Sequence, residues 1–148
     1  MRITSYCLIC GLLFVSAAVA LRAQNNQGQK EQESVYAELG KAPAKYQQMP
    51  NPMVNDPDAA VAGGILFEEH CEGCHGREGI GGKKAPTLRA PELRNATPGA
   101  IFWILSNGVV RKKMPVWSKL PEPERWQLVS YIRALNGQTK SLEAGKKP

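Results

Sequence analysis

The chain has 148 residues, of which 43% are apolar and 22% are charged, a composition typical of globular proteins and unlike that of disordered or fibrous chains. Its formal net charge of +6 is modest, and no concentrated basic stripe of the kind that nucleic-acid-binding proteins carry is present, so we exclude nucleic acid as a partner. At this length one folded domain is expected.

Residues 1–23 have the features of a cleaved secretory signal peptide. Arg2 is the positive start, a nearly unbroken apolar stretch occupies residues 3–20, and small residues follow. Cleavage is expected after Ala20 or Ala23, which predicts a periplasmic protein. A stretch of about 18 apolar residues also reaches the lower limit for a membrane span. The alternative is therefore an uncleaved anchor, and membrane association is expected only in that case.

Residues 24–55 are rich in Gln, Asn and Pro and have no sustained apolar period, so we interpret them as a flexible arm or linker. Only residues 35–39 favour a helical turn there. The folded domain is predicted to span residues 56–137, and residues 138–148 form a polar C-terminal tail.

Three helices are predicted within residues 56–137, and no segment alternates apolar and polar residues as a strand would. The first follows an Asp56-Pro57 start and runs over 59–70, and the second follows Thr97-Pro98 and ends at Gly108. The third spans about 121–136, has apolar residues at helical spacing and stops at Gly137. The fold class is therefore all-α.

The cysteines indicate the chemistry of the site. Two of the four lie in the signal segment, which leaves Cys71 and Cys74 and excludes a disulfide framework. With His75 they form C-x-x-C-H, in which two thiols one helical turn apart bond to the vinyl groups of a haem and the adjacent imidazole reaches the iron. We predict one covalent haem c, attached through Cys71 and Cys74 and ligated by His75.

Two other kinds of site use a pair of cysteines at this spacing. A zinc site also uses thiolates and imidazole, but it needs more ligands than this chain offers, since the other histidine is His70, next to Cys71. A thioredoxin-type redox pair is expected near a β-α-β pattern, which an all-helical chain lacks.

The second axial ligand of the iron is predicted to be Met114. Met1 lies in the signal segment, and Met49 and Met53 precede the haem motif. Met114 follows His75 by 39 residues, outside a regular helix and directly before Pro115, where a loop can direct its sulfur to the iron.

Together these residues resemble the class I c-type cytochromes of the mitochondrial and small bacterial kind, over about residues 56–137. The resemblance implies a small cytochrome c fold of three to five short helices wrapped around one covalently bound haem. Besides the haem motif, it rests on four sequence elements: Gly63-x-x-x-Phe67, Pro86-Thr87-Leu88, Met114-Pro115-Val116-Trp117 and Leu128-x-x-Tyr131. The last helix departs from the family, because Pro121-Glu122-Pro123-Glu124 stands where Ser, Thr or Asp often caps it.

The resemblance also implies roles for individual residues. Gly63 and Phe67 are expected to pack against Leu128 and Tyr131 where the first and last helices cross. A backbone carbonyl is expected to accept the ring N–H of His75. The residues expected to form the haem pocket are Pro86, which supplies that carbonyl, Leu88, Ile101, Leu105, Pro115 and Trp117.

The predicted function is that of a one-electron carrier rather than an enzyme, shuttling electrons between periplasmic or membrane-associated redox enzymes. Residues 76–117 contain eight basic residues and only two acidic ones, so partners with acidic docking surfaces are expected. The alternatives are a haem-containing subunit, or the electron acceptor, of a periplasmic dehydrogenase. A haem enzyme with an open sixth position would need distal polar groups, for which the chain has no spare histidine.

Overall fold

The computed structural model describes residues 36–137, so the predicted signal peptide and C-terminal tail lie outside the described residues. This part contains six α-helices and three 3₁₀-helices, and its only strand-like pairing is an isolated bridge between Val109 and Met114. In chain order the elements are η1 (Ala37–Lys41), α2 (Ala44–Gln47), α3 (Ala59–His70), α4 (Glu72–His75), η2 (Arg77–Gly79), α5 (Pro91–Asn95), α6 (Pro98–Asn107), η3 (Val110–Lys112) and α7 (Glu122–Leu135). The all-α prediction is confirmed, and α3, α6 and α7 correspond to the three predicted helices.

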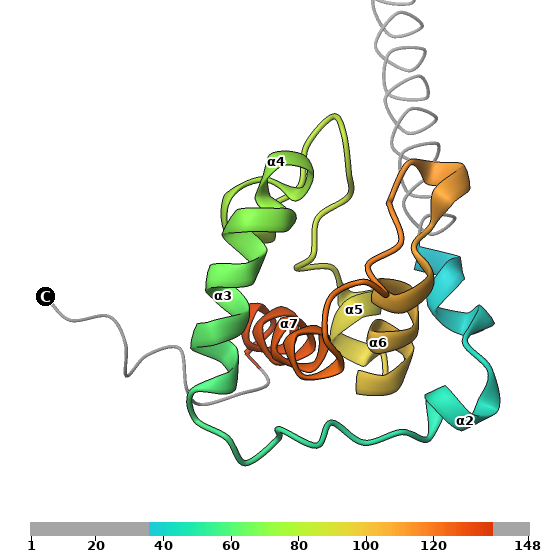
Figure 1. Ribbon diagram of the computed structural model, residues 1–148. Helices are drawn as coiled ribbons and strands as arrows, with labels where there is room; N and C mark the ends of the chain where they lie inside the picture. The colour runs from blue at the N-terminus through green and yellow to red at the C-terminus, as the bar shows by residue number, and fades with distance from the viewer. Residues whose placement is uncertain (1–35, 138–148) are drawn as a thin grey trace, which may run out of the picture. The chain divides into compact units, whose positions relative to one another are not determined.

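Helix α7 lies between α3 and α6 and packs against both (Figure 1). On one side the rings of Phe67 and Tyr131 lie 5.1 Å apart, and on the other those of Phe102 and Trp126 stack at 4.2 Å. Leu128 is fully buried between these contacts. The core therefore forms on both flanks of α7.

The crossing of α3 and α7 depends on Gly63. A Cβ atom at this position would lie 2.0 Å from the carbonyl oxygen of Gln127 and 3.0 Å from the Cβ of Tyr131. Because the oxygen belongs to the backbone, it cannot rotate away, and only glycine allows this approach. The sequence element Gly63-x-x-x-Phe67 thus lies against Leu128-x-x-Tyr131 in the structure.

Two helix starts differ in how they follow the sequence pattern. Thr97 caps α6 as its residue type predicts, since its hydroxyl accepts a hydrogen bond from the Ala100 N–H at 3.2 Å. Helix α3, by contrast, begins at Ala59. The Asp56 carboxylate accepts a hydrogen bond from the Asp58 N–H at 2.9 Å, so it closes a turn ahead of the helix instead of capping it.

Residues 36–55, which the sequence analysis assigns to an arm, pack on the helices in the structure. Tyr36 belongs to the buried core, Tyr46 of α2 stacks on Phe102 of α6, and the buried Asn51 donates a hydrogen bond to Ser130 of α7 at 2.8 Å. Buried polar contacts give no apolar periodicity, which is why the sequence pattern does not reveal this packing. The domain boundaries of the sequence analysis stay predictions.

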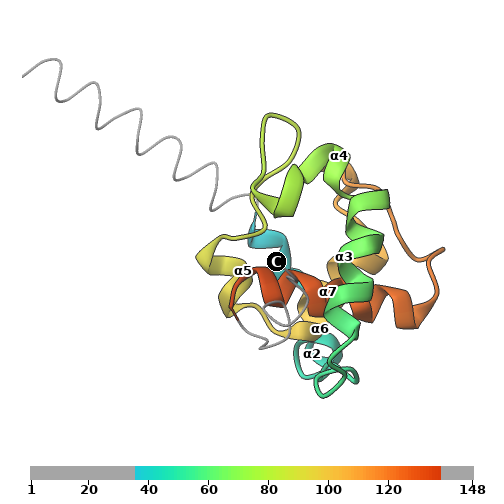
Figure 2. The same ribbon diagram turned by 90° about the vertical axis from the view of Figure 1, so that its left-hand side faces the viewer.

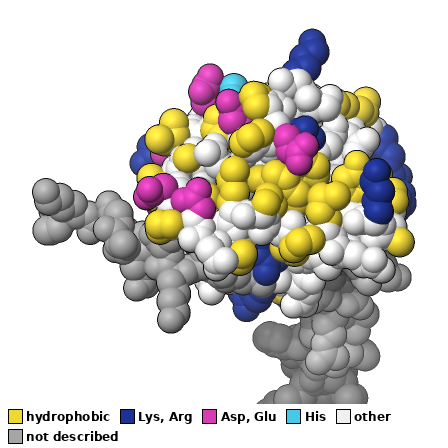
Figure 3. Space-filling model, turned by 60° about the horizontal axis from the view of Figure 1, so that its bottom comes forward, with side chains coloured by type: hydrophobic (Ala, Val, Ile, Leu, Met, Phe, Trp, Pro, Cys, Tyr) yellow, Lys and Arg dark blue, Asp and Glu magenta, His cyan; other side chains and the backbone are white. Residues whose placement is uncertain are grey.

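The connection from α2 to α3 runs below the three long helices in Figure 1, and in Figure 2 it turns upward into α3 at the bottom of the view. Figure 3 brings this lower side forward, where hydrophobic side chains form a band across the surface with charged side chains around it. No helix within residues 36–137 is long and apolar enough to cross a membrane.

Candidate haem-binding site

The C-x-x-C-H motif occupies the turn that follows α3. Cys71 ends α3, with its N–H donating to the Phe67 carbonyl, and its own carbonyl accepts the N–H groups of Cys74 at 3.1 Å and His75 at 2.9 Å. This short helical turn places both cysteines and the histidine on one compact segment. Neither thiol forms a disulfide, Cys71 is half-buried and Cys74 is exposed.

The environment of Cys71 favours a neutral sulfur. Burial, and secondarily the neighbouring Cys74, raises the pKa of the Cys71 thiol to about 11. A thioether to a haem vinyl group carries no charge and fits this setting. Within residues 36–137, no cluster of three or more His, Cys, Asp or Glu side chains is placed to hold a metal ion.

His75 is oriented by a backbone carbonyl. Its Nδ1 lies 3.0 Å from the carbonyl oxygen of Pro86, the pair that the family resemblance implies. A carbonyl can only accept, so Nδ1 carries the proton and Nε2 keeps its lone pair. Burial lowers the pKa of His75, against a smaller opposite effect of the Pro86 bond, so the ring is held neutral. A neutral imidazole with a free Nε2 is what an iron ligand requires.

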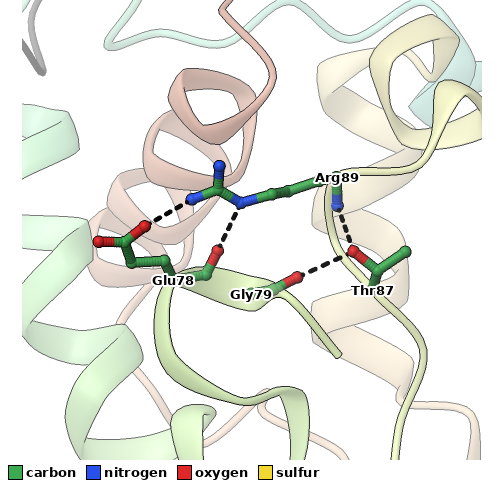
Figure 4. A network of polar contacts seen from close by, with 4 residues as sticks. All are labelled: Glu78, Gly79, Thr87 and Arg89. Carbon is green, nitrogen blue, oxygen red and sulfur yellow. Dashed lines mark hydrogen bonds and ion pairs between the residues drawn. The ribbon is translucent and has the colours of Figure 1, made fainter. Parts of the chain in front are cut away.

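The loop that carries Pro86 is held by a polar network (Figure 4). The Thr87 hydroxyl donates to the Gly79 carbonyl at 3.1 Å and accepts from the Arg89 N–H at 3.1 Å. Arg89 in turn donates from Nε to the Glu78 carbonyl at 3.0 Å and pairs with the Glu78 carboxylate at 2.9 Å. These contacts join the loop to η2, directly after the haem motif. The roles of Gly79, Glu78 and Arg89 in this network were not predicted, because no sequence signal marks them.

Met114 lies in a loop whose backbone is held by hydrogen bonds and by two residues with positive φ angles. Its N–H and carbonyl both pair with Val109, at 3.2 and 3.1 Å, and Lys113 before it adopts a left-handed conformation with φ of 66°. Gly108 opens the loop with φ of 65°, where a Cβ would lie 2.6 Å from the Pro115 carbonyl oxygen. The Met114 side chain is half-buried against the same hydrophobic core that Cys71 and Leu88 contact.

The other predicted pocket residues divide into buried and exposed groups. Ile101 and Leu105 of α6 are 2% and 3% exposed and belong to the core, whereas Pro115 is exposed. The Trp117 ring lies 5.3 Å from the ring of His70, at the end of α3. The structure therefore brings Cys71, His75 and Pro86 together and places Met114 and Trp117 on a separate loop beside the same core.

Three comparisons with known proteins bear on this arrangement. The family model described as "Cytochrome C oxidase, cbb3-type, subunit III" matches residues 58–132. A curated relative, the cbb3-type cytochrome c oxidase subunit CcoP of Rubrivivax gelatinosus, is 29% identical over 114 residues, which are 75% of this chain and 38% of the relative. The chain thus spans less than two fifths of that relative's length.

A solved structure, cytochrome CL from the marine methylotrophic bacterium Methylophaga aminisulfidivorans, matches with a TM-score of 0.51 and 25% identity, over 67% of this chain and 73% of that one. The family match includes α3, the C-x-x-C-H turn, Pro86, the Met114 loop and most of α7. Haem c is accordingly the cofactor, and electron transfer is the general function. Because this match covers half of the chain, the chain belongs to the family of cbb3-type cytochrome c oxidase subunit III, within the class I c-type cytochromes.

Proposed function

We propose that this protein is a one-electron carrier whose haem is bonded to Cys71 and Cys74 and ligated by His75 and Met114. The observation that carries the proposal is the 3.0 Å contact between His75 Nδ1 and the Pro86 carbonyl, directly after two thiols one turn apart. This contact fixes the tautomer that leaves Nε2 for the iron.

Bound at this site, the haem would supply a one-electron couple between ferric and ferrous iron. The role of the chain is to keep the surroundings the same in both states. Pro86 holds the His75 ring, the paired backbone of Val109 and Met114 holds the second ligand, and the buried Ile101 and Leu105 keep water from the core beside them. Little then reorganises during transfer, which favours a carrier.

The Met114 assignment separates a carrier from a haem enzyme. An enzyme needs an open coordination position and polar groups near it. The chain has two histidines, and His70 already contacts the Trp117 ring. The thioether of Met114, half-buried on a rigid loop, suits the closed, high-potential form of the iron.

The basic residues suggest how redox partners dock. Arg89 pairs with Glu78 and Arg111 with Glu38, so these two charges are partly neutralised within the domain. Lys112 and Lys113 are exposed on the Met114 loop, beside the exposed Val110. We expect this loop to meet an acidic partner surface, since opposite charges speed encounter.

Salt and charge reversal test this docking surface. The rate of electron transfer to an acidic redox protein is expected to fall as salt rises, because screening removes the attraction. A Lys112→Glu/Lys113→Glu variant should flatten that dependence, whereas Lys45→Glu on α2 should not. A rate independent of salt in the unaltered protein would refute it.

A second candidate is a cytochrome subunit of a larger membrane-associated redox enzyme, favoured by the similarity to an oxidase subunit. The haem chemistry would be unchanged, and only the partner and location would differ. The periplasmic location is likewise a proposal, because it depends on residues 1–23. Fractionation of cells decides between the two: a freely soluble periplasmic pool supports the carrier, and co-purification with a membrane oxidase supports the subunit.

Optical spectroscopy of the purified holoprotein tests the ligands. The ferric protein is expected to show the weak near-infrared band of a sulfur ligand on iron, and Met114→Ala should abolish it. Met53→Ala is the matched control, since Met53 also packs half-buried on the core but precedes the haem motif. If the band is absent from the unaltered protein and small ligands bind readily to its iron, the site is an open haem and the carrier proposal is wrong.

A further inference from the structure

The segment before α2 touches both loops to which we assign the axial ligands. Tyr36 is 7% exposed, and its hydroxyl donates a hydrogen bond of 2.5 Å to the Thr87 carbonyl. The preceding carbonyl, that of Pro86, accepts from His75. Two consecutive carbonyls are thus held from two sides, and the loop cannot rotate without breaking the contact with Tyr36 or the contact with His75.

The same segment reaches the Met114 loop two residues later. The Glu38 carboxylate, only 13% exposed, pairs with the Arg111 guanidinium and with Lys41 Nζ at 2.7 Å. Arg111 lies in η3, which is enclosed between the backbone-paired residues Val109 and Met114. A carboxylate this sheltered holds its cationic partners more firmly than a fully solvated one does.

The far end of the segment is anchored independently. Gln47 of α2 donates from Nε2 to the Leu39 carbonyl at 2.9 Å and accepts from the Thr97 hydroxyl at 3.2 Å. Tyr46 stacks on Phe102, with ring centroids 6.4 Å apart. The segment is therefore fixed to α6 and can restrain the loops instead of moving with them.

We propose that residues 36–41 form a strap that positions both axial ligands, with Tyr36 acting on His75 through the Pro86–Thr87 loop and Glu38 acting on Met114 through Arg111. The proposal rests on the assignment of His75 and Met114 above. It gives the segment before the haem-binding core a role in setting the properties of the iron, which the sequence motif does not indicate.

Tyr36→Phe tests the histidine side in the holoprotein. Losing one hydrogen bond should let the Pro86 loop open more often, so solvent exchange of the His75 Nδ1 proton, followed by NMR in the ferrous state, is expected to quicken about two- to tenfold. A weaker bond to Nδ1 makes the imidazole a less basic ligand, so the reduction potential should rise. Tyr46→Phe is the matched control, since the Tyr46 hydroxyl has no hydrogen-bond partner within residues 36–137 and its ring stacking is retained.

Glu38→Gln tests the methionine side. The near-infrared band is expected to disappear as pH rises. In Glu38→Gln the equilibrium constant for this loss should be about two- to fivefold larger, the range of one partly sheltered ion pair. Lys41→Gln is the control, because the Lys41 contact stays within the strap. Arg111→Gln should have the same effect as Glu38→Gln, and the double variant should add little to either.

The outcomes separate the strap from the ligand assignment. Suppose that the unaltered protein shows the near-infrared band. The strap is then refuted, while the carrier proposal stands, if Tyr36→Phe leaves the proton exchange rate and the reduction potential at the control values and Glu38→Gln leaves the pH midpoint for loss of the band unchanged. If the unaltered protein lacks the band, Met114 ligation and the methionine half of the strap both fail. The Glu38 variant also keeps the strap testable should the Tyr36 variant not hold haem.

Discussion

Substituting Gly63 by alanine tests the helix crossing that delivers the haem-binding turn. The added Cβ would lie 2.0 Å from the Gln127 carbonyl oxygen, where ordinary contact begins at 3.4 Å, so α3 and α7 must separate by 1.4 Å, the difference between these two distances. Overpacking of this kind costs about 1–3 kcal/mol, and an immovable backbone neighbour favours the upper end. Alanine recovers about 1 kcal/mol of helix propensity.

The net loss of stability is therefore expected to be about 2 kcal/mol for Gly63→Ala. The neighbouring Gly64 offers a matched control, because a Cβ there meets only the Tyr131 ring at 3.3 Å, and a side chain can give way. Gly64→Ala has the same gain in propensity and should be neutral or stabilising by up to about 1 kcal/mol.

Guanidinium unfolding of the two holoproteins, followed by far-UV circular dichroism, measures this difference. A gap of about 2–3 kcal/mol corresponds to at least roughly 8 °C in Tm for a domain of this size. Equal stability of the two variants would refute the argument that backbone contact at Gly63 sets the crossing. Because α3 ends at the haem motif, Gly63→Ala should also lower the yield of attached haem, while Gly64→Ala should not.

Three other changes have definite expected results. Ser130→Ala leaves the buried Asn51 amide without its hydrogen-bond acceptor, so thermal unfolding should show a loss of about 1–3 kcal/mol, and an unchanged Tm would contradict the role of this contact. Tyr131 has its pKa raised, first by burial and then by nearby carboxylates. The unfolded chain loses this proton at lower pH than the folded protein does, so the free energy of unfolding should fall as pH rises above about 10. Tyr131→Phe should remove that part of the fall, as measured by guanidinium titrations. An identical fall in both proteins would show the reasoning to be wrong. Cys74→Ala, which prevents normal haem attachment, should lose most of its helical circular dichroism, because so small a domain buries too little surface without its cofactor; a stable helical apoprotein would overturn this expectation.

Local signals made much of the fold and the central motif predictable from the sequence. Helix α7 has apolar residues at helical spacing, and Thr97 and Pro98 mark the start of α6 correctly. The short helices α2, α4 and α5 were not predicted, since four or five residues cannot show a 3.6-residue period. The predicted capping role of Asp56 is wrong, because an Asp before Pro serves turns as well as caps, and here it closes a turn ahead of α3.

The contacts around the ligand loops could not be predicted for a different reason. The hydrogen bonds of Tyr36 with Thr87 and of Asn51 with Ser130 join residues 51 and 79 positions apart. They are made by single polar side chains in a segment without apolar periodicity, so nothing in the local pattern identifies either partner. The Pro86 contact with His75 was accessible only through the family resemblance, because a carbonyl acceptor is available at every residue.

The long reach of these contacts also implies an order of assembly. Tyr36 and Asn51 leave the ribosome before their partners, and closing loops of such length carries an entropy cost that is repaid only when both ends are in place. The short turn from Cys71 to His75 needs no distant partner and forms from neighbouring residues. Cofactor attachment to that turn can therefore precede the closing of the first segment over α6, because the turn is complete without the contacts that this segment makes.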